Sequence, residues 1–415
     1  MNEIEINGII TKFSHERLSA SHAEHEFAEY IEGKCAKMGL SPRIECFGTE
    51  TYRIKHESLY VNGRAVFCKY HYGCGTGKAA AQIFYMPNIE DVSLSKCEGK
   101  IVLLDDRIGV ETYRRIVSAG AVGILIRGGG IQLKSGFLRR GELRFGRPVE
   151  KLIPCAVIGT EDFISIVKEK DAFAEMSVEM TKHNGKSPNV IADIQGESDE
   201  QIVLAAHIDS TEQSLGTYDN MSGCISLLIM AEYFSKNKPK RSLRFLWCGS
   251  EERGLLGSIA YCRRHKSDNK RAVLNVTLDM IGALTGPFVS YACANRESEE
   301  LLRSFAVERA HATDVRYMLR STDVKPFVAA GVPAVSFSRY ANTNVAPIHT
   351  EYDTPDAVSV ENIISDTEYI ASFVEHVANA EVFPIPRKID KGLKKEAKDY
   401  VNKDKEEKTK NTGKK

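Results

Sequence analysis

The chain has 415 residues, more than a single hydrophobic core usually serves, so we expect two domains and a shorter additional segment. Lysine plus arginine and aspartate plus glutamate each number 56, so the formal net charge is zero and no overall field recruits nucleic acid or an anionic membrane. No apolar run approaches the roughly 18 residues of a membrane span, and 42% hydrophobic residues suffice for globular cores.

The N-terminal sequence and the cysteines indicate a compartment. The first residues, MNEIEINGIITKF, lack the basic segment and apolar stretch of a secretory signal. Most of the ten cysteines lie inside apolar stretches such as FLWCGS and GCISLL, and no CxxC pair occurs. Buried free thiols in a reducing compartment explain this pattern more simply than five disulfides do. We therefore expect a cytoplasmic protein.

The N-terminal part of the chain predicts one helix and one strand. The segment SASHAEHEFAEYIEGKCAKMGL places Phe27, Ile31, Cys35 and Met38 on one face of an amphipathic helix that ends near Gly39. The following PRIECF predicts a strand. Further on, GKIVLLDD and IPCAVIG predict buried strands around a helix, turn and strand in ETYRRIVSAGAVGILIRGG, and none of them carries a set of ligands.

From Pro188 onward, strands alternate with helices. NVIADIQG, QIVLAAHID, SLRFLWCGSEE and AVLNVTLDM predict strands, and CISLLIMAEYF and LLGSIAYCRR predict helices between them. This alternation predicts a mainly parallel mixed sheet in a three-layer α/β/α fold.

These patterns divide the chain into three parts. We predict a catalytic domain in residues 1–55 and 186–385, with an inserted domain in residues 56–185. The remaining lysine-rich segment, residues 386–415, has few apolar residues to offset the entropy cost of ordering, so we expect it to be disordered.

Polar residues stand at the ends of successive predicted strands. They are His207 and Asp209 in AHID, Asp219 in TYDNMSG, Glu251 and Glu252 in GSEERG, Asp279 in LDMIG, and His349 in IHTEYDT. Each has a simpler explanation on its own: a hydrogen-bonded core histidine, a turn aspartate or a solvated glutamate pair. Together they fall at the carboxyl edge of an α/β sheet, where ligands bind, and they predict a two-metal hydrolase site.

The ligand chemistry suggests an assignment. Two divalent ions roughly 3.5–4 Å apart take imidazole and carboxylate ligands and need a shared anion to offset their repulsion. We assign His207 and Asp279 to one ion, Glu252 and His349 to the other, and Asp219 as the bridge.

Two residues remain for supporting roles. Glu251 is expected to be the general base that takes a proton from water and passes it to the leaving amine. Asp209 lies two residues beyond His207, so on an extended strand end its carboxylate would orient the imidazole.

These motifs resemble a known family. The series HID, YDNMSG, SEERGLLGS, LDMIG, STDVKPFVAAGVPA and IHTEYDTPD is similar in order and spacing to the M28 family of di-zinc peptidases, over residues 1–55 and 186–385. The resemblance implies the same five zinc ligands, Glu251 as the general acid/base, Asp209 as support and a cis peptide bond after Asp219.

The chain departs from the family pattern at one position. Several M28 members have a tyrosine just before the last histidine ligand, where it helps to stabilise the oxyanion, and this chain has Ile348. That role falls to the metals, Tyr340 or Tyr352.

A second resemblance concerns residues 56–185. GKIVLLDD followed by AGAVGILI resembles the protease-associated (PA) domain, a mostly-β module inserted in many peptidases. The resemblance implies a lid or docking surface that shapes substrate access.

We therefore expect a metal-dependent exopeptidase, in the first place an aminopeptidase acting on short peptides. A carboxypeptidase or a deacylase of N-acylated amino acids is the alternative, because the same metal core serves these reactions. An inactive scaffold is less favoured, since the chain keeps all five ligands and the base. Zinc suits the ligands best, although Co2+ or Mn2+ could bind. The sequence leaves the oligomeric state open.

Overall fold

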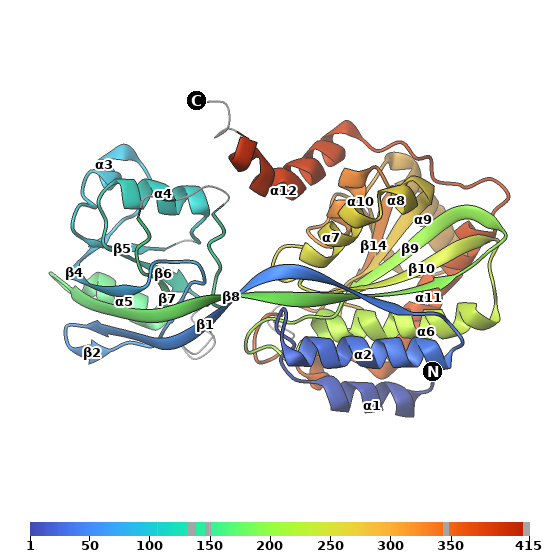
Figure 1. Cartoon of the computed structure of the whole chain (residues 1–415), viewed down its shortest axis with the longest axis horizontal. Coiled ribbons are helices and arrows are strands. Elements are labelled where there is room, and N and C mark those ends of the chain that lie inside the picture. The colour runs from blue at the N-terminus through green and yellow to red at the C-terminus, as the bar shows by residue number, and fades with distance from the viewer. Residues whose placement is uncertain (106, 131–137, 146–148, 150, 343–347, 410–415) are drawn as a thin grey trace. The chain divides into compact units, whose positions relative to one another are not determined.

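The computed structural model describes residues 1–105, 107–130, 138–145, 149, 151–342 and 348–409, with the backbone alone for residues 403–409. The chain divides into two compact units (Figure 1). Unit 1 comprises Met1–Thr49 and Gly185–Asn402, and unit 2 comprises Glu50–Asn184 with a terminal piece that begins at Lys403. Two long strands, β1 (Arg43–Val61) and β8 (Phe173–Ile194), continue from one unit into the other.

Unit 1 is built on a mixed sheet with the strand order β13-β12-β14-β11-β9-β10-β8. Strand β9 pairs in parallel with β10 and β11, and β11 pairs in parallel with β14, while β8 and β12 join their neighbours β10 and β14 antiparallel. The bounds are Ser198–His207 (β9), Arg241–Cys248 (β10), Ala272–Leu278 (β11), Phe288–Ala292 (β12), Thr313–Tyr317 (β13) and Ala334–Arg339 (β14).

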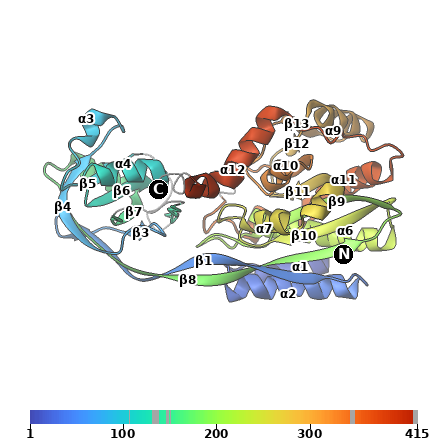
Figure 2. The ribbon, with the colours of Figure 1, turned by 45° about the horizontal axis from the view of Figure 1, so that its top comes forward.

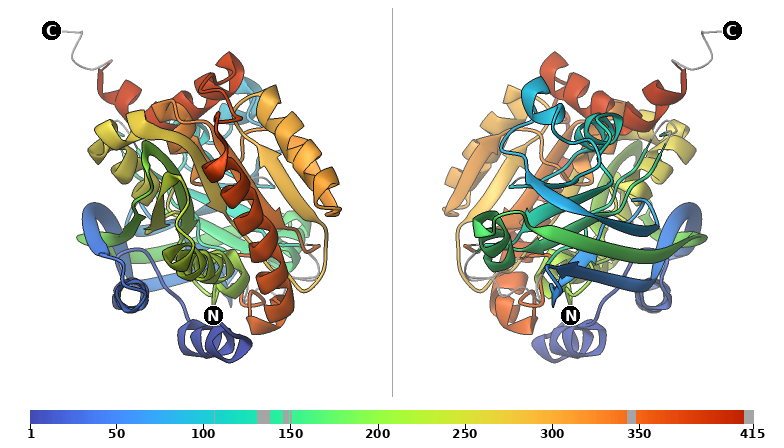
Figure 3. Two further views of the ribbon diagram at one scale, coloured as in Figure 1. Left: turned by 90° about the vertical axis from the view of Figure 1, so that its right-hand side faces the viewer. Right: turned by 90° about the vertical axis from the view of Figure 1, so that its left-hand side faces the viewer.

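Helices cover both faces of this sheet (Figures 1 and 3). One face packs against Glu3–Phe13 (α1), His22–Lys37 (α2), Ser222–Lys236 (α6), Arg296–Glu308 (α9) and Val360–Asn379 (α11). The other face packs against Leu256–Arg264 (α7), Lys266–Arg271 (α8), Val324–Ala330 (α10) and Lys391–Thr409 (α12). The three-layer α/β/α prediction is confirmed.

Strand β9 shows why its sequence is apolar throughout. Ile202, Leu204 and Ala206 belong to the larger core, and Val203 and Ala205 belong to the smaller core on the opposite face. Successive side chains of a strand point to opposite faces, so a central strand covered on both sides needs an uninterrupted apolar run.

Unit 2 has its own core and its own strands. Its strands follow β8 in the order β4-β5-β6-β7-β3, with β4 to β7 mutually parallel. The bounds are Arg64–Ala65 (β2), Cys68–Tyr70 (β3), Gly77–Tyr85 (β4), Ile101–Leu104 (β5), Gly123–Gly128 (β6), Cys155–Gly159 (β7), Asp91–Leu94 (α3), Val110–Ser118 (α4) and Thr160–Lys168 (α5).

The predicted disordered tail is wrong for residues 391–402, which belong to helix α12. Ile389, Leu393 and Ala397 recur at four-residue spacing and pack against the core cluster of β12 and α10, with Ala397 fully buried. The average composition of the tail hides this stripe because the lysines occupy the other faces of the helix. Residues 410–415 lie outside the described part of the chain.

The ten cysteines are all free thiols, and nine of them are buried, while Cys46 is exposed. The prediction of buried free thiols is confirmed for these nine. Among the described helices, none combines the length and apolar character that crossing a membrane requires.

We expect the aromatic core of unit 1 to contribute strongly to stability. Phe373 of α11 is fully buried, with ring centroids 5.4 and 5.5 Å from those of Phe305 and Phe337. Phe373→Ala should lower the free energy of unfolding by about 3–5 kcal/mol because it leaves a cavity. Urea unfolding followed by the fluorescence of Trp247, the only tryptophan, measures this. Val382→Ala, at a side chain that is 83% exposed, should stay within about 0.5 kcal/mol of wild type.

Candidate metal centre

The predicted site residues meet at the carboxyl edge of the unit 1 sheet. Strand β9 ends at His207, β10 ends three residues before Glu251, and β11 ends directly before Asp279. These three strands are parallel neighbours, so their carboxyl ends lie at the same edge. His349 reaches the same place from the segment after β14.

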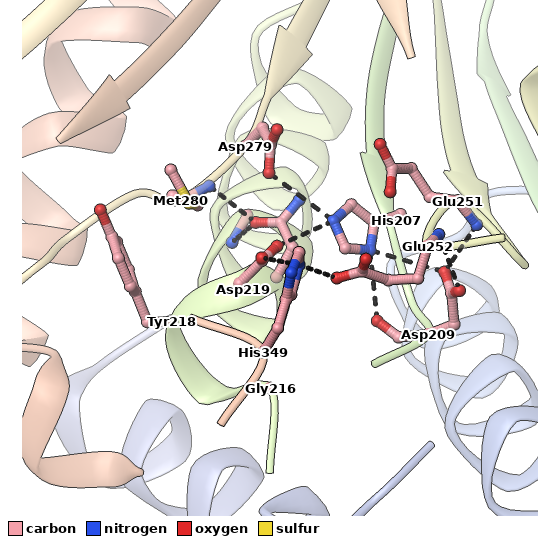
Figure 4. Close-up of polar contacts among 12 residues, drawn as sticks. His207, Asp209, Gly216, Tyr218, Asp219, Glu251, Glu252, Asp279, Met280 and His349 are labelled. Atoms are coloured by element: carbon pink, nitrogen blue, oxygen red, sulfur yellow. Dashed lines mark hydrogen bonds and ion pairs between the residues drawn. The ribbon is translucent and has the colours of Figure 1, made fainter. Parts of the chain in front are cut away.

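Asp219 lies at the centre of the cluster. Its Oδ1 is 3.1 Å from His207 Nε2, and its Oδ2 is 2.9 Å from His349 Nε2. Figure 4 shows the carboxylate between the two imidazole rings. Asp219 lies in the turn Thr217–Met221, directly before α6, where Asp219 and Asn220 have non-helical backbone angles. The peptide bond to Asn220 is cis, as the family resemblance implied.

Two groups of potential ligands share Asp219. The first contains His207, Asp219 and Asp279, and the second contains Asp219, Glu252 and His349; within each group the ligand atoms lie within 4.8 Å of one another. His349 Nε2 is 2.6 Å from Glu252 Oε1. These are the two groups that the sequence assigns to two ions.

The environment of the Asp279 carboxylate indicates whether a cation fits between this residue and His207. Its Oδ1 is buried, lies 3.6 Å from His207 Nε2 and has no hydrogen-bond partner. Because an unsatisfied buried carboxylate oxygen is unfavourable, its position beside an imidazole nitrogen suits a metal ion. Its Oδ2 accepts a hydrogen bond of 3.3 Å from Arg320.

Asp209 supports the site in a way that the sequence did not predict. Its two carboxylate oxygens accept hydrogen bonds from the main-chain N–H groups of Glu251 (2.9 Å) and Glu252 (3.1 Å). The contact with the His207 ring is made mainly by the Asp209 main-chain carbonyl, 3.2 Å from Nδ1, while the carboxylate is 3.5 Å away. Asp209 therefore holds three residues of the site in position: Glu251 and Glu252 through their main-chain N–H groups, and His207 through its ring.

The titratable side chains of the cluster shift one another's pKa values. Burial opposes the charged form of Asp219, but His207 and His349 outweigh it and lower the pKa of this carboxyl. Burial also opposes the charged form of His349, and Glu252 and Asp219 overcome it, raising the pKa of His349 to about 9. Burial, reinforced by Glu252, raises the pKa of Glu251 well above its usual range. Glu251 therefore has a high proton affinity.

Asp353 holds the central turn, and the sequence analysis missed it. This buried carboxylate accepts hydrogen bonds from the main-chain N–H groups of Tyr218 (2.7 Å) and Asp219 (3.1 Å). Burial, together with the charge of Asp219, raises the pKa of Asp353 to about 7. Its position four residues after His349 in the IHTEYDT motif was the available signal.

Arg17 supports the loop before Asp219 from a distant part of the sequence. Its guanidinium is fully buried and donates to the main-chain carbonyls of Phe13, His15, Ile208, Leu215 and Gly216 at 2.8–3.1 Å. Nothing in the local sequence of Arg17 indicates this role, because its partners come from three separate segments.

Glu24 supports the loop that carries the glutamate pair. Its Oε1 accepts hydrogen bonds from the Ser187 hydroxyl (2.9 Å) and the Ser250 main-chain N–H (3.0 Å), and Oε2 accepts one from the Ala20 N–H (2.7 Å). Burial and the nearby Asp209 raise the pKa of Glu24 to about 8.

Left-handed backbone conformations occur beside the ligands. Ser250, Met280 and His349 have φ values of 53°, 63° and 60°. Such values are uncommon for residues other than glycine and concentrate at functional sites, where the surrounding structure holds them. The loops that carry the candidate ligands therefore adopt locally unfavourable backbone angles.

The cluster lies at a pocket of about 240 Å³. Besides the potential ligands and Glu251, the pocket is lined by Gly254, Leu255, Met280, Arg320, Ser321, Ile348 and Tyr400. Of the two tyrosines considered for oxyanion stabilisation, Tyr340 has its ring centroid 4.9 Å from the Arg320 guanidinium, and Tyr352 is 46% exposed. Among the described residues that line the pocket, the one tyrosine is Tyr400.

Comparisons with known proteins concern the part of the chain that carries this cluster. Residues 189–374 match the family model described as Peptidase family M28. This segment of the chain is therefore similar to peptidase family M28.

Aminopeptidase Y of Saccharomyces cerevisiae is 31% identical over 217 residues, which are 48% of this chain and 40% of the yeast protein. The chain thus spans well under two thirds of that relative. A zinc aminopeptidase from Bacillus subtilis superposes with a TM-score of 0.77 at 22% identity, covering 92% of this chain and 97% of the other. An aminopeptidase from Aneurinibacillus sp. gives a TM-score of 0.75 at 22% identity, covering 94% and 97%. These structures share the fold.

We expect Asp353 to be needed for the geometry of the central turn. Asp353→Ala leaves two buried N–H groups without their acceptor, so the free energy of unfolding should fall by about 1–3 kcal/mol for each of them. Urea unfolding in the presence of a chelator, followed by Trp247 fluorescence, separates this effect from metal binding. Asp356→Ala, at an exposed position in the same segment, is the control. Equal stability of the two variants would contradict the role of Asp353.

Proposed function

We propose that the chain is a two-metal aminopeptidase that removes N-terminal residues from short peptides. The observation that carries this proposal is the Asp219 carboxylate, with one oxygen 3.1 Å from His207 Nε2 and the other 2.9 Å from His349 Nε2. A carboxylate between two imidazoles, each with a further carboxylate beside it, matches what a pair of divalent ions requires.

The donor set favours zinc. His207, Asp219 and Asp279 would hold one ion, and Asp219, Glu252 and His349 would hold the other, with Co2+ or Mn2+ as substitutes. The related Bacillus subtilis protein is described as a zinc aminopeptidase, which supports this choice. Bound zinc would polarise the scissile carbonyl and lower the pKa of water in the site.

Glu251 carries the proton in this proposal. It lines the pocket beside the ligands, and burial favours the protonated form of its carboxyl. A carboxylate with a raised pKa accepts a proton from the attacking water and later donates it to the leaving amine. Asp209 assists by holding the main-chain N–H of Glu251, which fixes the position of the carboxylate.

The size of the pocket supports an exopeptidase. A volume of about 240 Å³ lies below the roughly 300–1,000 Å³ of pockets that enclose whole drug-sized ligands, so it suits one terminal residue and not an extended chain. Because the similar proteins named above are aminopeptidases, we propose the amino end and not the carboxyl end.

Two further assignments stay proposals. The resemblance of residues 56–185 to a PA domain supports a role of this part in substrate access. The nine buried free thiols support a reducing compartment such as the cytoplasm.

The role of Glu251 can be tested directly. Glu251→Gln should lower kcat by roughly 10²–10⁴, because an amide cannot accept the proton, while the metal content measured by mass spectrometry stays unchanged. Glu361→Gln, at an exposed glutamate of α11, should leave kcat unaltered. Near wild-type turnover by metal-loaded Glu251→Gln would refute this assignment.

A substrate panel tests the reaction class. We expect hydrolysis of aminoacyl p-nitroanilides, loss of activity after chelation and recovery on addition of Zn2+, Co2+ or Mn2+. The N-acetylated p-nitroanilides should not be hydrolysed. Deacetylation of N-acetyl amino acids, or release of C-terminal residues from peptides, would instead identify one of the alternative activities.

A further inference from the structure

The last helix of the chain reaches the candidate metal centre. Figure 2 shows α12 beside α10 on one face of unit 1. Within α12, Leu393, Ala397 and Tyr400 follow each other at spacings of four and three residues, so they share one face of the helix. Leu393 and Ala397 contact the core, and Tyr400 lines the pocket. One helical stripe therefore joins the core to the pocket.

The segment before α12 is firmly attached. Asn295 donates hydrogen bonds to the main-chain carbonyls of Pro386 (3.1 Å) and Lys388 (2.6 Å). The main-chain N–H of Asp390 donates to the Ala294 carbonyl (2.9 Å). These contacts attach the residues before α12 to Ala294 and Asn295, which follow strand β12. The position at which the helix begins is therefore set by the fold.

A buried cation holds the far part of the helix. Lys325 of α10 is only 8% exposed, and its Nζ lies 3.3 Å from Glu396 Oε1 and 4.7 Å from the ring centroid of Tyr400. The ammonium is buried, which strengthens the cation–π contact, whereas the Glu396 side chain is 53% exposed and its ion pair is partly screened by water. Arg263 adds a hydrogen bond of 3.4 Å to the Val401 carbonyl. Lys325 thus contacts the Tyr400 ring, and Arg263 holds the main chain of the next residue.

The other residues that line the pocket indicate a role for the Tyr400 ring in substrate binding. Leu255, Met280 and Ile348 provide its other large apolar side chains, and the remaining residues are mostly charged groups of the metal centre. An apolar substrate side chain would therefore lie among these three residues and the Tyr400 ring.

Resting on the proposed aminopeptidase function, we propose that Tyr400 is a specificity-determining residue. Its ring forms a fixed side wall that limits the pocket to apolar N-terminal residues of about leucine size. The wall comes from the C-terminal helix, so docking of α12 sets the selectivity while the metal ligands remain unaffected.

Variants at Tyr400 separate the ring from its hydroxyl. For each variant, kcat/KM is measured with leucine and tryptophan p-nitroanilides. Tyr400→Ala should lower the leucine-to-tryptophan selectivity ratio by at least about 10-fold, since a missing contact in an apolar pocket changes selectivity roughly 10- to 200-fold. Tyr400→Phe keeps the ring and should change the ratio by less than about twofold. The metal content should stay the same in both.

A second variant tests the docking of the helix without replacing any residue that lines the pocket. Ala397→Glu places a charge at a fully buried position, so it should detach α12 and change the ratio in the same direction as Tyr400→Ala. Lys398→Ala, on the exposed side of the same helix, should behave as wild type. Trp247 fluorescence confirms that unit 1 remains folded.

Binding of free L-leucine and L-tryptophan, measured by calorimetry, provides a readout that does not depend on turnover. A wild-type protein that cleaves no aminoacyl substrate refutes the proposed function, and the binding ratio still tests Tyr400. An unchanged ratio in Tyr400→Ala, or no binding of either amino acid to wild type, overturns the inference. Loss of kcat in Tyr400→Phe equal to that in Tyr400→Ala would also overturn it, because the hydroxyl would then be the essential group.

Discussion

The contact of one carboxylate with two imidazoles organises unit 1 at its functional edge. Asp219 must stand between His207 and His349, although these residues come from the end of β9 and from the segment after β14. Both oxygens of the carboxylate are engaged, so its orientation is tightly constrained. The kinked turn before α6, the carboxylate of Asp353 and the carbonyl contacts of Arg17 all serve this constraint.

Concentrating so many carboxylates in a buried place requires compensation. Buried charges are tolerated when hydrogen bonds or opposite charges satisfy them. Asp209 and Asp353 each accept two main-chain N–H groups, and Glu24 accepts two together with a hydroxyl. The support of the site therefore comes largely from backbone amides, whose positions are fixed by the fold. This explains why the ligand loops can retain unfavourable φ values at Ser250 and Met280.

The C-terminal helix adds a different kind of constraint. Its contact with the core depends on small and apolar residues at a few positions, whereas Tyr400 at its far part lines the pocket. Because Lys325 contacts both Glu396 and Tyr400, a single buried ammonium links helix docking to the wall of the pocket. In our proposal, selectivity therefore depends on the C-terminal helix, and catalysis depends on residues at the strand ends.

The sequence by itself determined the fold class, and it predicted which side chains would meet at one edge of the sheet. The alternation of apolar strands and helices is a local property, and the candidate ligands follow strand ends in motifs that can be read one at a time. Other features depended on residues far apart in the sequence. Arg17 and Glu24 support loops some 200 residues away, and their local context shows only a loop and a helix start. The order of α12 was likewise decided by tertiary structure, because a lysine-rich helix with one narrow apolar stripe is stable only where a matching core surface receives it.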